Sequence, residues 1–281
     1  MSHPELTINI RGKLIDFHIP KVMAIINSTP DSFYAESRGD SLEKLYRLID
    51  RAVKEGADIL DIGGCSTRPG SESCSAGEEY ERIKPAFDYI KEFYPELPLS
   101  LDTWRSEVAR KAIETWDVDI INDISGGEMD PDLWDVVAES KKIYVLTHTR
   151  GTPANMHTLT GYDDVTAEVI KELSEKLFVL RGKKINDIII DPGFGFAKTS
   201  SQNLRLLDDL EQFCHIGFPV LVGLSRKSMI WKTLDTTPEE SFAGTVALDA
   251  LALEKGADIL RVHDVKAAKE TVRLMTEMKK R

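Results

Sequence analysis

The stretch Glu55-Gly-Ala-Asp-Ile-Leu-Asp61 is repeated, with one change at each end, as Lys255-Gly-Ala-Asp-Ile-Leu-Arg261. In both copies a helical pattern ends at a glycine, Gly56 or Gly256, and a short apolar run follows. A glycine at this place can adopt the left-handed backbone that ends a helix before a strand begins. The repeat therefore predicts the same helix–turn–strand junction at two distant places in the chain.

Short apolar runs alternate with longer amphipathic segments throughout the chain. The predicted strands are residues 22–26, 59–62, 98–101, 119–121, 143–146, 187–190, 219–222 and 258–262. The predicted helices are residues 41–55, 78–93, 106–116, 131–140, 163–181, 201–213, 238–255 and 265–279. Strands that alternate with helices are typical of parallel βαβ units, and eight units in 281 residues favour a closed barrel. We therefore expect an α/β fold of the (β/α)8 TIM-barrel class.

A further pair of short runs precedes the first predicted strand. Residues 6–10 and 13–17 flank Arg11-Gly12, which is typical of a β-hairpin turn. We expect residues 1–20 to form a short hairpin that caps the bottom of the barrel, and residues 1–281 to be a single domain. A doubly wound open sheet is the alternative, but no Gly-x-Gly-x-x-Gly motif follows the first strand.

The chain is acidic, with 47 Asp and Glu against 36 Lys and Arg and a net charge of −11. An acidic surface repels nucleic acid and anionic lipid, so neither is an expected partner. No apolar run is long enough to span a membrane and no signal-peptide pattern is visible, which favours a cytoplasmic protein. Cys65, Cys74 and Cys214 form no Cys-x-x-Cys pair, so we expect reduced thiols.

Polar residues follow each of the eight predicted strands. A barrel brings the carboxyl ends of all its strands to one rim, where barrel enzymes carry their active sites. A single Asp or Asn after a strand more often forms a turn or caps a helix, and Asp123, Ser125 and Asp130 are interpreted in that way. The coincidence at eight strand ends nevertheless predicts an enzyme with a polar active site at this rim.

Cations follow the last two predicted strands. Ser225 and Lys227 come after the seventh strand, and Arg261 and His263 after the eighth. Barrels often bind phosphate between these two loops, and guanidinium and ammonium groups make the charge-assisted contacts that a phosphate needs. In an acidic chain, this local positive charge predicts an anion-binding site.

Hydrogen-bond acceptors follow the third, fourth and sixth strands, at Asp102, Asn122 and Asp191. Such a set suits a flat heterocycle with several N–H donors, because a carboxylate can accept two parallel hydrogen bonds. A general acid/base pair is the competing interpretation, and spacing does not separate the two. The chain contains no His-x-His or His-Glu-x-x-His spacing, so a zinc site built from protein ligands is not expected.

In this order, the motifs at the strand ends resemble those of the dihydropteroate synthase family over residues 21–278. They are Asn27-Ser-Thr-Pro-Asp-Ser-Phe33, Asp61-Ile-Gly-Gly-Cys-Ser-Thr-Arg-Pro-Gly70, Asp102-Thr103, Ile121-Asn-Asp-Ile-Ser-Gly-Gly127, Asp191-Pro-Gly-Phe-Gly-Phe196, Gly223-Leu-Ser-Arg-Lys-Ser228 and Arg261-Val-His-Asp264. The resemblance implies a transferase of folate biosynthesis that condenses 6-hydroxymethyl-7,8-dihydropterin diphosphate with 4-aminobenzoate and releases pyrophosphate. It also implies Mg²⁺ as cofactor, a homodimer and a sulfonamide target.

The resemblance assigns roles to residues by position. The pterin would be bound by Asp102, Asn122, Asp191 and Lys227. The diphosphate would be bound by Asn27, Thr67, Arg68, Arg261 and His263, with Asn27 as the Mg²⁺ ligand. The aminobenzoate pocket would be lined by Phe33, Thr67, Arg68, Pro69, Phe196 and Ser225. The catalytic residues would be Lys227, Arg261, His263, Asp102 and Asp191.

The chain departs from the family pattern at positions that carry none of these roles, namely Ser28, Cys65, Thr147, Thr149 and Ala197. We expect these departures to change affinities more than the reaction. One alternative is a pterin-dependent methyltransferase that passes a methyl group from methyltetrahydrofolate to a corrinoid protein, but such an enzyme needs no diphosphate site. The other is a pterin-binding barrel without catalysis, against which the full set of polar strand ends argues.

Overall fold

A closed barrel of eight parallel strands is the centre of the computed structural model, which describes residues 6–29, 38–65 and 74–279. The strands are β3 (Lys21–Asn27), β4 (Ile59–Gly63), β5 (Leu99–Asp102), β6 (Ile120–Asp123), β7 (Ile143–Thr147), β8 (Ile188–Asp191), β9 (Leu221–Val222) and β10 (Ile259–Val262). Their order in the sheet is β8-β7-β6-β5-β4-β3-β10-β9. A parallel bridge between Ile190 and Val220 joins the two ends of this order. The predicted (β/α)8 barrel is thus confirmed.

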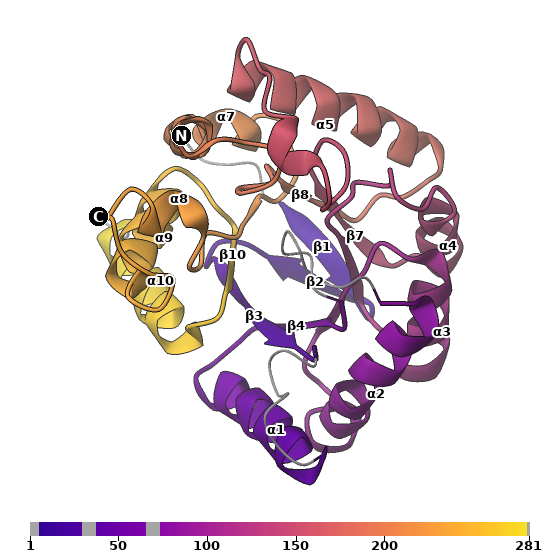
Figure 1. Ribbon diagram of the computed structural model, residues 1–281. Helices are drawn as coiled ribbons and strands as arrows, with labels where there is room; N and C mark the ends of the chain where they lie inside the picture. Colours follow the sequence, from indigo (N-terminus) through magenta and orange to yellow (C-terminus); the bar gives the residue numbers. More distant parts are fainter. Residues whose placement is uncertain (1–5, 30–37, 66–73, 280–281) are drawn as a thin grey trace.

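Helices surround the strands as an outer ring (Figure 1). They are α1 (Arg38–Lys54), α2 (Ala76–Phe93), α3 (Ser106–Trp116), α4 (Leu133–Ser140), α5 (Val165–Gly182), α6 (Ser200–Asp208), α7 (Glu211–Cys214), α8 (Ser228–Trp231), α9 (Phe242–Glu254) and α10 (Val265–Lys279), with a 3₁₀ turn, η2 (Met156–Thr158), before α5. Among the described helices, none is both long and apolar enough to cross a membrane.

Three elements differ from the sequence-based expectation. The helix expected at 201–213 is divided into α6 and α7, and α8 was not predicted. The strand expected at 219–222 has only two residues as β9, because Pro219 has no N–H to donate and the Val220 N–H donates to the Asp258 carboxylate at 2.8 Å. The barrel is therefore held most weakly between β8 and β9.

The repeated sequence forms the same junction twice. Gly56 and Gly256 adopt left-handed backbone angles, with φ of +92° and +98°, directly after α1 and α9. Each is followed by an aspartate that binds the start of a neighbouring strand. Asp58 accepts from the Val22 N–H at 2.7 Å, as Asp258 does from Val220. The repeat therefore places β4 and β10 on the two sides of β3, where both are hydrogen-bonded to it.

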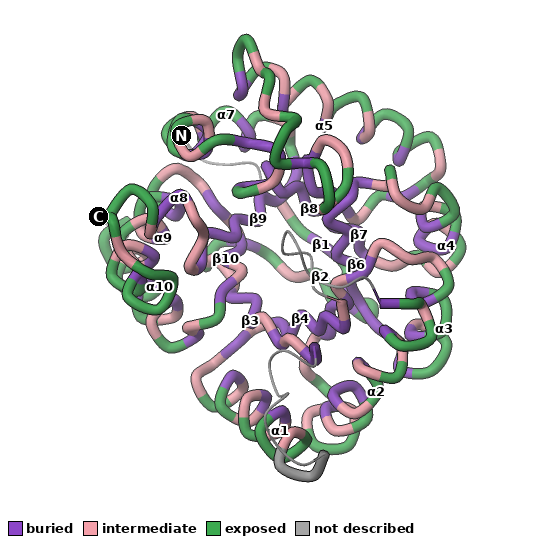
Figure 2. Tube along the Cα trace, viewed as in Figure 1, coloured by how far each residue is buried: buried purple, intermediate pink, exposed green. Residues whose placement is uncertain are grey.

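The core has two layers. The larger one lies between the barrel and its helices, and the smaller fills the lower barrel interior and reaches the hairpin. Figure 2 shows buried residues along the strands and exposed residues on the outer faces of the helices. The smaller layer consists of Ile8, Ile10, Phe17, Met23, Ile59, Ile120, Ile143, Val145, Ile189, Leu221 and Ile259. Its residues from the barrel strands and from the hairpin make the two parts one packed unit.

The N-terminal hairpin is antiparallel, with β1 (Thr7–Ile10) paired to β2 (Lys13–Asp16). Arg11 and Gly12 both have positive φ, as the predicted tight turn requires. The Arg11 guanidinium donates two hydrogen bonds of 2.8 Å to Asp119, which precedes β6. The expected hairpin is therefore confirmed, and it lies at the amino-terminal ends of the strands.

Replacing Ile8 by Ala should lower the free energy of unfolding by about 2–5 kcal/mol, because Ile8 is 1% exposed and its removal leaves a cavity. Leu14→Ala is the matched control, since Leu14 lies in the same hairpin but is 71% exposed and should change stability by less than about 0.5 kcal/mol. Urea unfolding followed by circular dichroism measures both. Equal effects of the two substitutions would show that the hairpin does not share the barrel core.

Candidate active site

Asp61 lies at the centre of a buried hydrogen-bond network at the carboxyl end of the barrel. Its side chain is fully buried and accepts hydrogen bonds from Ser100 Oγ at 2.5 Å, Asn122 Nδ2 at 2.9 Å and Arg261 Nε at 2.7 Å. These donors come from β5, β6 and β10. A buried carboxylate is stable only when it is paired and hydrogen-bonded, and Arg261 supplies the opposite charge. Asp61 thus joins four strands, although the sequence analysis did not identify it as a site residue.

Arg261 bridges two carboxylates, because its Nη2 also donates to Asp102 Oδ2 at 2.5 Å. Burial raises the pKa of Asp102 to about 7, although the positive charge of the Arg261 guanidinium acts to lower it. The neighbouring Asp61 carboxylate adds to the upward shift. Among the described residues, Arg261 Nη1 makes no hydrogen bond, so one edge of the guanidinium can face an anion.

Lys227 and Asp191 lie close enough at the rim for their charges to act on each other. Burial lowers the pKa of Lys227 to about 8 and raises that of Asp191, and each charge opposes the shift of the other. Lys227 Nζ donates to the Phe194 carbonyl and lies 4.8 Å from the centroid of the Phe196 ring. Asp191 also accepts from the Gly193 N–H at 2.7 Å. The structure therefore brings the predicted pterin residues Lys227 and Asp191 together, with Phe196 beside them.

Ser225 binds His263 across the loops that follow β9 and β10. Ser225 Oγ lies 3.0 Å from His263 Nδ1 and also accepts from the His263 N–H at 3.3 Å. Ser225 is buried, whereas His263 is exposed. The neighbouring cation Arg226 pairs with Asp264 at 3.0 Å, so its charge is already neutralised. Arg261 is also paired, but its Nη1 makes no hydrogen bond among the described residues, so Arg261 remains a candidate for binding an anion together with Lys227 and His263.

Asn27 ends β3, opposite Gly63 of β4, and is half-buried. Its side chain makes no hydrogen bond to any part of the chain that the structure describes. The remaining predicted site residues, Phe33, Thr67, Arg68 and Pro69, lie outside the described residues.

Lys198 anchors the loop after β8, a role that the sequence analysis missed. This buried lysine donates to the carbonyl groups of Gly193 and Phe196, and its Nζ lies 3.0 Å from His148 Nδ1. Burial lowers the pKa of His148 to about 4, so its neutral ring can accept from Lys198 and donate from Nε2 to Glu172 at 2.9 Å. This gives β7, which had no assigned function, the role of positioning the Asp191 loop. The signal in the sequence was a lysine and a histidine on adjacent strand ends.

Four of the departures from the family pattern, Ser28, Thr147, Thr149 and Ala197, are buried. The hydroxyl groups of Ser28 and Thr147 have no hydrogen-bond partner among the described residues. Ala197 adopts a left-handed backbone with φ of +49°. This conformation costs an L-residue other than glycine about 1–2 kcal/mol.

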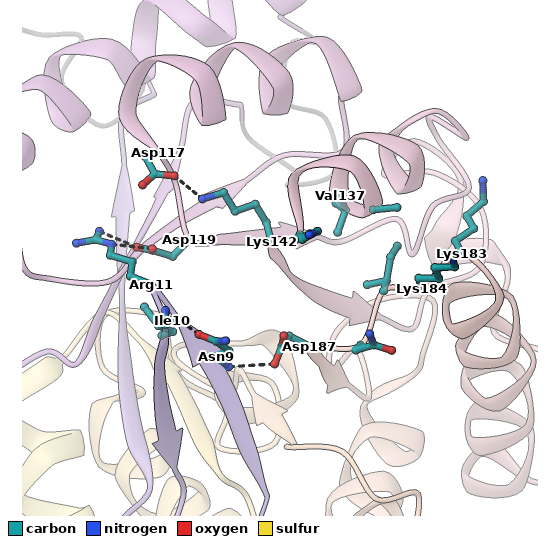
Figure 3. A pocket seen from close by; sticks show the side chains of 15 residues that line it. Asn9, Ile10, Arg11, Asp117, Asp119, Val137, Lys142, Lys183, Lys184 and Asp187 are labelled. Atoms are coloured by element: carbon teal, nitrogen blue, oxygen red, sulfur yellow. Dashed lines mark hydrogen bonds and ion pairs between the residues drawn. The ribbon is translucent and has the colours of Figure 1, made fainter.

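A cavity of about 720 Å³ lies at the other end of the barrel, between the hairpin and the segments that follow α4 and α5. Figure 3 shows two ion pairs among its charged groups, Lys142 with Asp117 and Arg11 with Asp119. The perturbed pKa values gather instead at the carboxyl rim, where barrel enzymes carry their active sites. We therefore place the candidate active site at the rim.

Asp61→Asn should destabilise the fold by about 3–5 kcal/mol, because it leaves Arg261 and Asn122 donating toward a neutral amide inside the barrel. Ser100→Ala is the control, since it removes one hydrogen bond to the same carboxylate and should cost only about 1 kcal/mol. Urea unfolding at pH 7.5 gives both values. A difference between the variants of less than about 1 kcal/mol would contradict the central role of the Asp61 charge.

Comparison with known proteins agrees with this geometry. Residues 23–263 match the family described as pterin binding enzyme. A dihydropteroate synthase of Synechocystis sp. is 44% identical over 249 residues, which cover 88% of this chain and 86% of the relative. The solved dihydropteroate synthase of Xanthomonas albilineans with 4-aminobenzoic acid is 37% identical, with a TM-score of 0.89 and coverage of 98% and 99% of the two chains. A complex of the synthase from the same organism with 7,8-dihydropteroate is 35% identical, with a TM-score of 0.86 and coverage of 97% and 98%. The chain therefore belongs to the dihydropteroate synthases of the pterin binding enzyme family.

Proposed function

We propose that this protein condenses 6-hydroxymethyl-7,8-dihydropterin diphosphate with 4-aminobenzoate to give 7,8-dihydropteroate and pyrophosphate in folate biosynthesis. The observation that carries the proposal is the rim itself, where the acceptors Asp102 and Asp191 lie beside the cations Arg261 and Lys227. The similar structures with 4-aminobenzoic acid and with 7,8-dihydropteroate support the identity of one substrate and of the product.

The pterin is bound by the carboxylates and the amide. Asp102 and Asp191 accept its N–H groups, because an ionised carboxylate offers only acceptors. Asn122 donates from Nδ2 to Asp61, which fixes the amide and leaves Oδ1 as a further acceptor. This arrangement favours heterocycle recognition over the alternative of a general acid/base pair.

The reaction breaks a C–O bond to the diphosphate and forms a C–N bond to the amine, which then loses a proton to solvent. The departing diphosphate gains negative charge, which Arg261, His263 and Lys227 stabilise from one side. The methylene carbon gains positive charge, which the pterin shares with Asp102 and Asp191. The aryl amine is a nucleophile at neutral pH, so the chemistry needs no activating base.

The family resemblance implies Mg²⁺, and Asn27 fits it. Its amide oxygen is a hard ligand, and Mg²⁺ in proteins typically uses one or two protein oxygen atoms together with phosphate and water. The Asn27 side chain also has no competing hydrogen bond among the described residues. When bound, Mg²⁺ supplies Lewis-acid stabilisation to the diphosphate oxygens. Thr67 and Arg68 complete the proposed diphosphate site.

The 4-aminobenzoate pocket is the part of the rim next to Phe196 and Lys227. In the proposal, Phe196 packs on the benzoate ring with Phe33 and Pro69, while Thr67 and Arg68 contact its polar groups. Ser225, expected in this pocket, contributes through His263, which it hydrogen-bonds. A sulfonamide that resembles 4-aminobenzoate competes at the same place.

A cytoplasmic homodimer completes the proposal. Helix α9 is apolar around most of its circumference, and a helix of this kind is typically covered on both sides. Its outward residues Phe242 and Leu251 are exposed, as are Leu274 and Met278 on α10. A second copy packed on this face would cover them.

The direct test is turnover of the purified protein with both substrates and Mg²⁺, measured as dihydropteroate by absorbance and pyrophosphate by a coupled assay. Both products should appear in equal amounts, and chelation of Mg²⁺ should stop the reaction. Lys227→Ala should lower kcat/KM by about 10²–10³-fold, because it removes a desolvated charge next to the leaving group. Lys141→Ala, at the bottom of the barrel, should have no effect. The proposal is wrong if neither product forms, or if Lys227→Ala retains full activity.

The pH dependence of kcat/KM for the pterin diphosphate should be bell-shaped. Activity should rise as Asp102 loses its proton near pH 7, and fall as Lys227 loses its own near pH 8. Lys227→Arg should abolish the alkaline fall, because a guanidinium stays charged over the whole range. An unchanged alkaline limb in Lys227→Arg would assign that limb to another group.

A further inference from the structure

Two cysteines that carry none of the roles assigned above lie side by side at the rim. Cys65 follows β4 and is half-buried, whereas Cys74 is buried and directly precedes Ser75, the N-cap residue of α2. Their Sγ atoms and a carboxylate oxygen of Glu79 all lie within 4.8 Å of one another. The Cys74 thiol donates to the Gly64 carbonyl at 4.0 Å. The third cysteine, Cys214, lies elsewhere and donates to the carbonyl groups of the segment after α9.

The backbone on both sides of this thiol pair is held by regular structure. Gly64 packs so closely against α2 that an added Cβ would lie 2.8 Å from the Glu79 carbonyl. On the other side, Ser75 and Glu78 form a capping box that fixes the start of α2. The two sulfur atoms, which lie within 4.8 Å of each other, are therefore kept close by the fold.

The cation next to Cys65, Cys74 and Glu79 is Arg105. Arg105 pairs with the buried Glu79 carboxylate, donates to the Cys74 carbonyl at 2.6 Å, and lies close enough to Cys65 for its positive charge to act on the thiol. A guanidinium beside a thiol favours its thiolate form, which is the nucleophile in oxidation. The neighbouring Cys74 thiol and the Arg105 charge lower the pKa of Cys65, against the effect of burial, whereas the pKa of Cys74 is raised. Cys65 is also the more exposed of the two thiols, so a peroxide reaches it first, and Cys74 is placed to attack second.

We propose that Cys65 and Cys74 form a reversible redox pair, in which a hydroperoxide oxidises Cys65 and Cys74 converts the product to a disulfide. The Cys65 thiolate attacks the peroxide, so that an S–O bond forms, the O–O bond breaks and hydroxide leaves. Cys74 then attacks the resulting sulfenic acid, an S–S bond forms, and the Cys74 proton leaves with the hydroxyl group as water. A dithiol reverses the change by exchange.

The same three ligand atoms also fit a thiophilic metal ion such as Zn²⁺. The position of Arg105 favours oxidation, because a metal ion would have to displace the guanidinium from Glu79 and from Cys65. We therefore argue for the redox pair and treat metal binding as an outcome of the test.

The disulfide would close a covalent ring over residues 65–74, which contains Thr67, Arg68 and Pro69. An effect on catalysis rests on the proposed function, which assigns these three residues to the diphosphate and the aminobenzoate. Ring closure restricts the backbone angles of the enclosed segment, so the oxidised form should bind 4-aminobenzoate differently from the reduced form.

The first experiment measures thiol chemistry alone on the full, reduced chain. After treatment with stoichiometric hydrogen peroxide at pH 6.5, two of the three thiols should be lost, and peptide mapping should show the Cys65–Cys74 link, which dithiothreitol removes. Cys74→Ser should instead give a sulfenic acid that dimedone traps at Cys65. Cys65→Ser should not react, and the control Cys214→Ser should behave as the parent protein does.

Arg105→Lys tests the role of the guanidinium while keeping a cation next to Glu79. The pH at which Cys65 oxidation reaches half of its maximal rate should rise by about one unit, because Arg105 is one of the groups that lower the pKa of Cys65. The proposal is overturned if Cys65→Ser oxidises at the parental rate, or if the mapped disulfide involves Cys214 or a second chain. It is also overturned if the reduced protein binds one Zn²⁺ that Cys65→Ser loses, since the cluster is then a metal site.

A second experiment compares the KM for 4-aminobenzoate of the reduced and the oxidised protein. We expect oxidation to raise KM by about fivefold or more, and dithiothreitol to restore it. Cys74→Ser, which cannot form the ring, should keep the KM of the reduced protein after dithiothreitol treatment. A disulfide that forms without a change in KM contradicts the effect on catalysis but not the redox pair, whereas a reduced protein without turnover contradicts the proposed function.

Discussion

A single negative charge inside the barrel constrains the arrangement of the site. Asp61 has no contact with solvent, so its ionised carboxylate must be neutralised and hydrogen-bonded within the fold. Arg261 meets this requirement from β10, while Ser100 and Asn122 meet it from β5 and β6. The same contacts fix two groups that the proposed function assigns to the substrates, namely the guanidinium and the Asn122 amide. Stability of the barrel and geometry of the rim therefore depend on one interaction.

Charged groups at the bottom of the barrel form ion pairs, whereas several charged groups at the rim have shifted pKa values. At the bottom of the barrel, Arg11 and Asp119 compensate each other at the surface of a cavity, and this end serves to close the core. At the rim, burial shifts the pKa values of Asp102, Asp191 and Lys227 toward neutrality. Groups of this kind gain their full charge only when a ligand of opposite character replaces water, which is the condition for strong binding of a charged transition state. An acidic protein can in this way hold a diphosphate in one small region.

The sequence was sufficient for the barrel, the hairpin and most strand ends, because hydrophobic periodicity and the left-handed glycines are local signals. It was insufficient for the contacts between strands that are distant in the chain. Asp61 was counted as part of an apolar strand, because its partner Arg261 lies on β10, which is separated from β4 by β3. The ion pair between Arg226 and Asp264 likewise has no signal in the local sequence. A strand was predicted at residues 219–222, but its shortness was not, because the side chain of Asp258 takes the N–H that a longer strand would use. The residues Phe33 and Thr67 to Pro69 remain predictions from resemblance, since they lie outside the described residues.

The weak join between β8 and β9 has a consequence for motion. A single bridge, between Ile190 and Val220, closes the barrel there, whereas the other neighbouring barrel strands are paired over at least two positions. Local opening should therefore begin at this join, and its backbone amides should exchange hydrogen with solvent before those of β4 and β5. Asp191 and Lys227 leave the barrel on its two sides, so small fluctuations at the join change the separation of these two groups directly. Backbone motion of the barrel is thereby concentrated at the part of the rim where one ring system must enter and a larger product must leave.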